Sequence, residues 1–142
     1  MAVVGRVVDR EGQPIKGALL YVYHTSARGW YSDRAAHIAA IAGDAKHARL
    51  FGYMRTDATG TFELHTIRPA GYPDTDLPEH IHVELEGTDT APGSVATEIQ
   101  FDDDARLTPE WRRRSQKEGF RIAKVHKGKD GLQRVQVEFT IP

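Results

Sequence analysis

Short runs of β-branched and aromatic residues recur along this chain, with Gly, Pro and Asp between them. The clearest run is residues 80–85, whose sequence His-Ile-His-Val-Glu-Leu alternates polar and apolar side chains. Because successive side chains of a strand point to opposite faces, Ile81, Val83 and Leu85 should face a core and the two histidines should face away from it. A half-buried strand of this kind requires a second layer to cover its apolar face.

The same reasoning predicts about eight short strands, joined by turns, and therefore an all-β sandwich of two sheets. We expect strands at residues 3–9, 18–24, 52–57, 61–67, 80–85, 97–101, 120–126 and 132–141. The first two should form a hairpin or an arch, the last two a hairpin, and residues 88–94 a loop. Residues 25–50 are a long irregular insertion. A helix should follow Thr108 and end by Gly119, since Thr108 is a good N-cap and Pro109 suits the first helical position.

Length and composition set limits on the function. At 142 residues the chain is expected to be a single domain, residues 1–142. A formal net charge of -1 gives no argument for nucleic-acid binding. No cysteine is present, so any metal must take nitrogen and oxygen ligands. No run approaches the ~20 apolar residues of a membrane span. We therefore expect a cytoplasmic protein with no membrane contact, and the sequence leaves a homo-oligomer open.

The two outward histidines could converge on one ion, because two-residue spacing places His80 and His82 on the same face of a strand. Imidazole alone does not choose between Zn, Cu, Fe and Ni. Tyr72 narrows the choice: it precedes Pro73, in a stiff extended segment that can hold its phenol near the histidines. A phenol ionises at neutral pH only beside a strong positive charge, so this combination suggests ferric iron. The plainer interpretation is a polar strand face beside a packed tyrosine.

Two resemblances bear on these motifs. Residues 5–18 and 56–62 resemble the carboxypeptidase-regulatory-like and transthyretin-like sandwich modules, which have no catalytic activity. That resemblance implies a transthyretin-like (prealbumin-like) topology and no chemistry. A non-catalytic binding module is accordingly one alternative for the whole chain.

The second resemblance is to the intradiol ring-cleavage dioxygenases, the catechol, protocatechuate and hydroxyquinol enzymes with non-haem ferric iron, which share that scaffold. It covers residues 4–101 and rests on four short motifs. The motifs are Arg28-Gly29-Trp30-Tyr31, Thr66-Ile67-Arg68-Pro69-Ala70-Gly71-Tyr72-Pro73, Pro78-Glu79-His80-Ile81-His82 and Ile99-Gln100-Phe101. The resemblance implies that Tyr31, Tyr72, His80 and His82 bind Fe(III) and that Gln100 lies near the substrate.

The resemblance also implies a reaction. A catechol-type substrate and O2 would give a cis,cis-muconate-type product by cleavage between the two hydroxyl-bearing carbons, with both oxygen atoms incorporated. Tyr72 would accept a substrate proton as it leaves the metal. Two phenolates and one hydroxide would balance the +3 charge of iron, so no carboxylate is needed beside the histidine pair.

The chain departs from the family pattern at Leu77. Family members usually carry an arginine there, which stabilises negative charge on the bound substrate. Arg28 and Arg34 are candidates to replace it; otherwise the substrate differs. The loop between Tyr72 and His80 is also shorter than usual. A metal-binding homologue that has lost turnover is therefore a further alternative.

Overall fold

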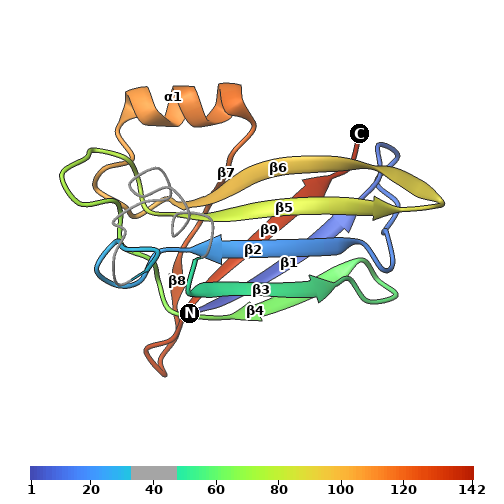
Figure 1. Cartoon of the computed structure of the whole chain (residues 1–142), viewed down its shortest axis with the longest axis horizontal. Helices are drawn as coiled ribbons and strands as arrows, with labels where there is room; N and C mark the ends of the chain where they lie inside the picture. The colour runs from blue at the N-terminus through green and yellow to red at the C-terminus, as the bar shows by residue number, and fades with distance from the viewer. Residues whose placement is uncertain (33–47) are drawn as a thin grey trace.

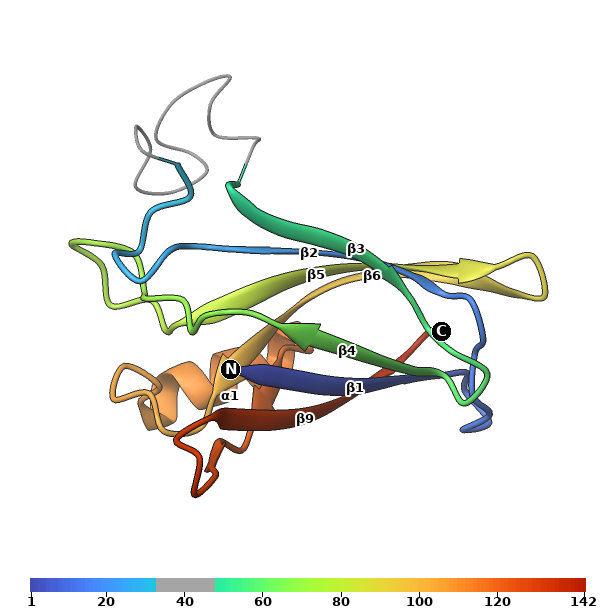
Figure 2. The same cartoon turned by 90° about the horizontal axis from the view of Figure 1, so that it is seen from below.

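The computed structural model describes residues 1–32 and 48–142, and these residues form two β-sheets packed face to face (Figure 2). One sheet has the strand order β4-β1-β9-β8 and the other has the order β3-β2-β5-β6-β7. The predicted all-β sandwich is confirmed. The elements are β1 (Ala2–Val8), β2 (Leu19–His24), β3 (Leu50–Arg55), β4 (Thr61–His65), β5 (His80–Thr88), β6 (Ala91–Phe101), α1 (Pro109–Glu118), β7 (Arg121–Ala123), β8 (His126–Lys127) and β9 (Gln133–Thr140).

The core lies between the two sheets and takes the apolar face of β5. Ile81, Val83 and Leu85 are each no more than 1% exposed, as the alternation predicted. The opposite sheet contributes buried residues that include Val3, Val7, Val135 and Phe139. Burial of this apolar surface is the main favourable contribution to folding, at about 25 cal/mol per Å² removed from water.

Strand β5 is central in its sheet, between β2 and β6. In this register His82 lies directly across from Tyr23 on β2 and from Glu98 on β6. His80 lies across from Gln100. Because directly paired residues share a face, these polar side chains all project from the outer face of the larger sheet. Their shared position brings ligand-type residues from three strands together.

The prediction of a loop at residues 88–94 was wrong, because β6 begins at Ala91 and extends to Phe101. Pro92 and Gly93 lie within the strand, and both are exposed. Strand β7 pairs with β6 only from Ile99 onward, so the first part of β6 is an open edge. An edge strand tolerates proline because the missing N–H would have faced solvent. Strand β3 also differs from expectation: it begins at Leu50, two residues before the predicted start.

The first and last strand pairs show how the chain crosses between sheets. Strands β1 and β2 belong to different sheets, so the connection between them is an arch. The predicted strand at 120–126 is divided: β7 pairs in parallel with β6, whereas β8 forms the antiparallel hairpin with β9. The chain changes sheets between these two short segments, which one continuous strand could not do.

The predicted helix is confirmed as α1, and it lies beside β6 and β7 (Figure 1). The Thr108 hydroxyl accepts a hydrogen bond from the Trp111 N–H (3.3 Å), and Gly119 ends the helix in the left-handed conformation. Ser115 is the buried residue of the helix. Among the described residues, no helix has the length and apolar character to cross a lipid bilayer.

Phe139→Ala should lower the free energy of unfolding by about 3–5 kcal/mol, because Phe139 is 1% exposed and stacks on Phe62 in the core. Urea denaturation measures the change. Phe51→Ala is the matched control, since Phe51 is 59% exposed, and its effect should stay within about 0.5 kcal/mol. Equal losses in the two variants would contradict the placement of the core.

Candidate metal centre

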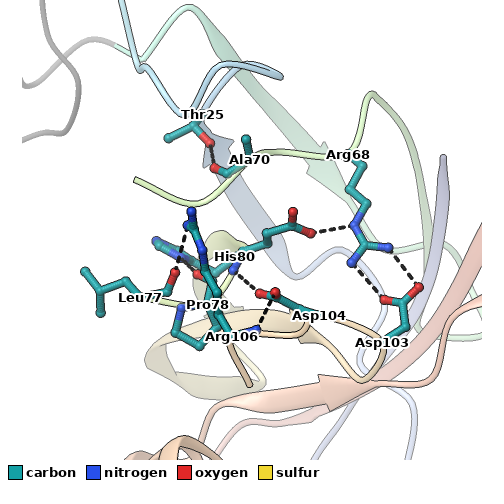
Figure 3. Close-up of polar contacts among 10 residues, drawn as sticks. Thr25, Arg68, Ala70, Leu77, Pro78, His80, Asp103, Asp104 and Arg106 are labelled. Atoms are coloured by element: carbon teal, nitrogen blue, oxygen red, sulfur yellow. Dashed lines mark hydrogen bonds and ion pairs between the residues drawn. The ribbon is translucent and has the colours of Figure 1, made fainter. Parts of the chain in front are cut away.

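Two loops meet at one end of the sandwich, the loop after β2 and the loop between β4 and β5 (Figure 1). The Thr25 hydroxyl donates to the Ala70 carbonyl oxygen at 2.6 Å (Figure 3). The Ala70 N–H donates to the Ser26 carbonyl oxygen at 3.1 Å. These hydrogen bonds join segments more than forty residues apart in sequence. They bring Tyr31 of the first loop to Tyr72 of the second.

Gly29 allows the two loops to approach this closely. Its φ is +77°, a conformation that other residues adopt with strain. A β-carbon at Gly29 would lie 2.2 Å from the Gly71 carbonyl oxygen and 3.0 Å from Pro73 Cδ. Glycine at this position is therefore required both by the backbone angle and by the contact.

The two phenols and two imidazoles converge as one cluster. The hydroxyl oxygens of Tyr31 and Tyr72 are 2.7 Å apart. The Tyr72 oxygen is 3.1 Å from His80 Nε2 and 3.4 Å from His82 Nε2. The two Nε2 atoms are 3.2 Å apart, and His82 Nε2 is 2.8 Å from the Tyr31 oxygen. Four ligand-type atoms from β5 and both loops thus face a common point.

These separations fit the donor set of a metal ion. Donor atoms bonded to one ion at about 2.0–2.2 Å lie roughly 3 Å from one another. The five distances within the cluster run from 2.7 to 3.4 Å. Two neutral imidazoles and two phenols are also nitrogen and oxygen donors of the kind that a hard or borderline cation accepts.

Each histidine ring is oriented from its other nitrogen. His80 Nδ1 donates to the Pro78 carbonyl oxygen at 2.7 Å, which directs Nε2 toward the cluster. His82 Nδ1 lies 3.7 Å from a carboxylate oxygen of Glu98. Partners of this kind fix ring orientation and tautomer in metal sites.

Glu98 is the residue that sequence reasoning missed. The ligand atoms of Glu98, His80 and His82 all lie within 4.8 Å of one another. A carboxylate thus lies beside the histidine pair, although the charge balance of iron did not require one. In the sequence, Glu98 stands two residues before Gln100 and therefore shares its face of the strand. Only the pairing of β5 with β6 shows that Glu98 lies across from His82.

Burial controls the charge of the cluster. Burial raises the pKa of the Tyr31 phenol far above its usual range, and the neighbouring Tyr72 raises it further. Burial also raises the pKa of Tyr72. Burial and the nearby His80 lower the pKa of His82 to about 3. Without a cation these groups are neutral at pH 7, and a bound cation would instead favour ionised phenols.

An arginine fixes the segment that leads into β5. Arg68 Nε donates to a Glu79 carboxylate oxygen at 2.6 Å, and its two terminal nitrogens donate to Asp103 at 3.0 and 2.7 Å (Figure 3). Asp104 accepts from the Glu79 N–H at 2.7 Å. Bidentate pairing of this kind is geometrically specific. Asp103 and Asp104 therefore hold the backbone next to His80.

The other predicted site residues lie in different surroundings. Gln100 is 2% exposed; its amide oxygen accepts from the Ser115 hydroxyl at 2.6 Å and its amide nitrogen donates to Glu98 at 3.2 Å. Arg28 lies over the Trp30 ring, 5.4 Å from its centroid. Arg28 and Trp30 line a hollow of about 340 Å³, and Tyr31 is the only residue of the cluster that also lines it. Arg34 lies outside the described residues.

Comparisons with known proteins show the family and support the fold. A family model described as dioxygenase matches residues 1–141. The chain belongs to the intradiol ring-cleavage dioxygenase family.

Relatives and solved structures show how far the likeness extends. The protocatechuate 3,4-dioxygenase beta chain of Burkholderia cepacia is 32% identical over 113 residues, which are 75% of this chain and 46% of that protein. Catechol 1,2-dioxygenase of Candida albicans is 37% identical over 71 residues, which are 50% of this chain and 22% of that protein. Hydroxyquinol 1,2-dioxygenase from Pseudomonas putida DLL-E4 shares the fold, with a TM-score of 0.71 at 22% identity over 99% of this chain and 55% of that structure. The chain thus spans less than half the length of the curated relatives it matches.

Acid should destabilise the chelator-treated protein through His82. Its pKa is about 3 in the folded state, below the 6.5 of an unperturbed histidine, so the unfolded state binds more protons between these values. The free energy of unfolding therefore decreases as the pH falls below 6.5. The loss caused by His82 reaches about 2 kcal/mol at pH 5. Urea denaturation at pH 7.5 and pH 5 should show a smaller pH difference in His82→Asn than in the wild type. His126→Asn, at an exposed position, is the control; an unchanged pH difference in His82→Asn would contradict the assignment.

Proposed function

We propose that this protein is a non-haem Fe(III) intradiol dioxygenase that cleaves a catechol-type ring with O2 to a cis,cis-muconate-type product. The observation that carries the proposal is the convergence of the Tyr31 and Tyr72 oxygens with the Nε2 atoms of His80 and His82, with five distances of 2.7 to 3.4 Å between them. Those four residues would hold the iron. Family membership supports the reaction class, and the named relatives act on catechol and protocatechuate.

When bound, ferric iron supplies a Lewis acid that draws electron density from a chelated catecholate and makes the ring reactive toward O2. The protein would position the substrate and accept its protons. A catechol hydroxyl beside Tyr72 would transfer its proton to the phenolate oxygen of Tyr72. Tyr72 suits this role because it lies on a loop, whereas His80 and His82 are fixed on β5. Gln100 would lie near the substrate. Its amide nitrogen donates a hydrogen bond to the Glu98 carboxylate there.

Glu98 gives this site more negative charge than two tyrosinates alone. Its carboxylate lies on the Nδ1 side of His82, away from the nitrogen that faces the cluster. We assign it to the orientation of His82, since a carboxylate near the second ring nitrogen favours the tautomer that leaves the other nitrogen free for a metal.

A non-catalytic module of the transthyretin-like kind is the second candidate, favoured by the sandwich scaffold itself. That candidate gives no reason for four ligand-type groups to converge at one point. A packed core or a polar strand face would normally separate such groups or pair them with backbone. Metal content distinguishes the two candidates directly.

Purified protein loaded with Fe(III) should be burgundy, because tyrosinate-to-iron charge transfer absorbs visible light. Tyr72→Phe should shift or weaken this band, since it removes one of the two phenol donors. Tyr53→Phe is the matched control, because Tyr53 is 64% exposed on β3, outside the cluster, and its spectrum should equal that of the wild type. A folded protein that takes up no iron and stays colourless would refute the metal assignment.

His80→Ala should abolish iron binding and oxygen uptake with catechol, hydroxyquinol and protocatechuate while leaving the sandwich folded, because His80 lies off the core face. Metal analysis, an oxygen electrode and circular dichroism measure the three properties. His65→Ala, at an exposed position on β4, should retain all of them. Loss of the folded spectrum in His80→Ala alone would favour a packing role for that ring. Iron binding without oxygen uptake in the wild type would indicate a homologue that has lost turnover.

A further inference from the structure

A small cavity adjoins the four-residue cluster on the side of the helix. It has a volume of about 130 Å³ and lies between Tyr72 and His80 on one side and Trp111 and Arg114 of α1 on the other. Pockets for drug-sized ligands measure roughly 300–1,000 Å³. A cavity of this size suits a single ring.

The face of α1 that lines this cavity is held against β6. Trp111, Arg114 and Ser115 are spaced i, i+3 and i+4, so they share one side of the helix. Ser115 is fully buried, and its hydroxyl donates to the Gln100 amide oxygen at 2.6 Å. This contact fixes the rotation of the helix about its axis. Arg114 is thereby directed to the cavity, while its neighbour Arg113 lies on a different side.

The Arg114 guanidinium is held in place by an aromatic ring. Its central carbon lies 4.6 Å from the centroid of the Trp111 ring, in a cation–π contact. Within residues 1–32 and 48–142, no carboxylate pairs with it. The side chain is exposed, whereas His80 at the opposite end of the cavity is 7% exposed. An oriented positive charge therefore stands at the outer end of the cavity.

The inner end carries the opposite charge. The Glu98 carboxylate and the Gln100 amide line it, next to His80. Arg114 and Trp111 also line a neighbouring hollow, together with Arg106 and two further acidic residues, Asp76 and Glu110. The field along the cavity thus favours a ligand whose anionic group lies outward, at Arg114.

We infer that Arg114 is a specificity-determining residue that binds an anionic substituent, such as a carboxylate, on the ring edge opposite the two hydroxyls of the substrate. The inference rests on the proposed function for the placement of the hydroxyls at Tyr72 and His80. Arg28, one of the two sequence-based candidates for this cation, lines the other hollow, which shares only Tyr31 with the cluster. Leu77, which replaces the expected arginine, lines the same cavity as Arg114. A cation from the helix would therefore act on the same ligand.

Binding can be tested without iron or turnover. The metal-free protein is titrated with 4-hydroxybenzoate and with phenol, and the two indole N–H signals are followed by NMR. With 4-hydroxybenzoate we expect the Trp111 signal to shift and that of Trp30, in the other hollow, to stay unchanged. Arg114→Gln should weaken binding about tenfold or more, since hydrogen bonds to charged groups contribute about 1.5–3 kcal/mol. Binding of phenol should change little.

The matched control is Arg113→Gln, which removes the same charge one residue away, at an exposed position that does not line the cavity. It should bind 4-hydroxybenzoate as the wild type does. Arg114→Lys should restore part of the affinity, because it keeps the charge but loses the planar fork. Equal affinity of wild type and Arg114→Gln for 4-hydroxybenzoate, or equal weakening in both glutamine variants, would overturn the assignment.

Kinetics separate failure of this inference from failure of the proposed function. In iron-loaded enzyme, Arg114→Gln should raise KM for 3,4-dihydroxybenzoate about tenfold or more, with kcat and the KM for catechol within about twofold of the wild type. If the wild type cleaves both substrates but the variant shows no such difference, only the role of Arg114 fails. If the wild type cleaves no catechol, the proposed function fails, and the NMR titration still decides whether Arg114 binds the carboxylate.

Discussion

The pairing of β5 with its two neighbours is the constraint on which both the core and the candidate metal centre depend. The alternating side chains of one strand place Ile81 and Val83 in the core and His80 and His82 on the outer face. A shift of one residue in register would exchange these two sets. The apolar face is fully buried, so the energy of core packing also fixes the direction of the histidine rings. The two histidines thus lie on a strand whose register is fixed by the packing of the core.

The tyrosines depend on a different kind of constraint, because both lie on loops. Their hydroxyls are only 2.7 Å apart although 41 residues separate them in sequence. Backbone hydrogen bonds around Ala70 and the close contact at Gly29 hold the two loops together. The histidines are thus fixed by a central strand, whereas the tyrosines are held by contacts between two loops. This difference agrees with the proposed role of Tyr72 as the ligand that accepts a proton.

Sequence reasoning succeeded where local physics decides the structure. The alternation of residues 80–85 and the capping of α1 at Thr108 were read correctly, because strand period and helix caps act over a few residues. It failed at Pro92, where the absence of a neighbouring strand made an unfavourable residue acceptable, and at residues 120–126, where the chain crosses between sheets. Glu98 was missed for a related reason, since its nearness to His82 depends on the register between two strands. Long-range pairing has no local signal of this kind.

The carboxylate of Glu98 changes the charge balance expected for the centre. Two tyrosinates and a hydroxide would already balance a trivalent ion, so a dianionic substrate that replaced hydroxide and one tyrosinate would face an extra negative charge nearby. In a site of low effective dielectric, such a charge raises the cost of binding an anion unless a cation compensates. Arg114 lines the same cavity as Glu98, at its outer end. In the proposed complex Arg114 would supply that cation, and the hydrogen bond from Ser115 to Gln100 sets the face of the helix from which it acts.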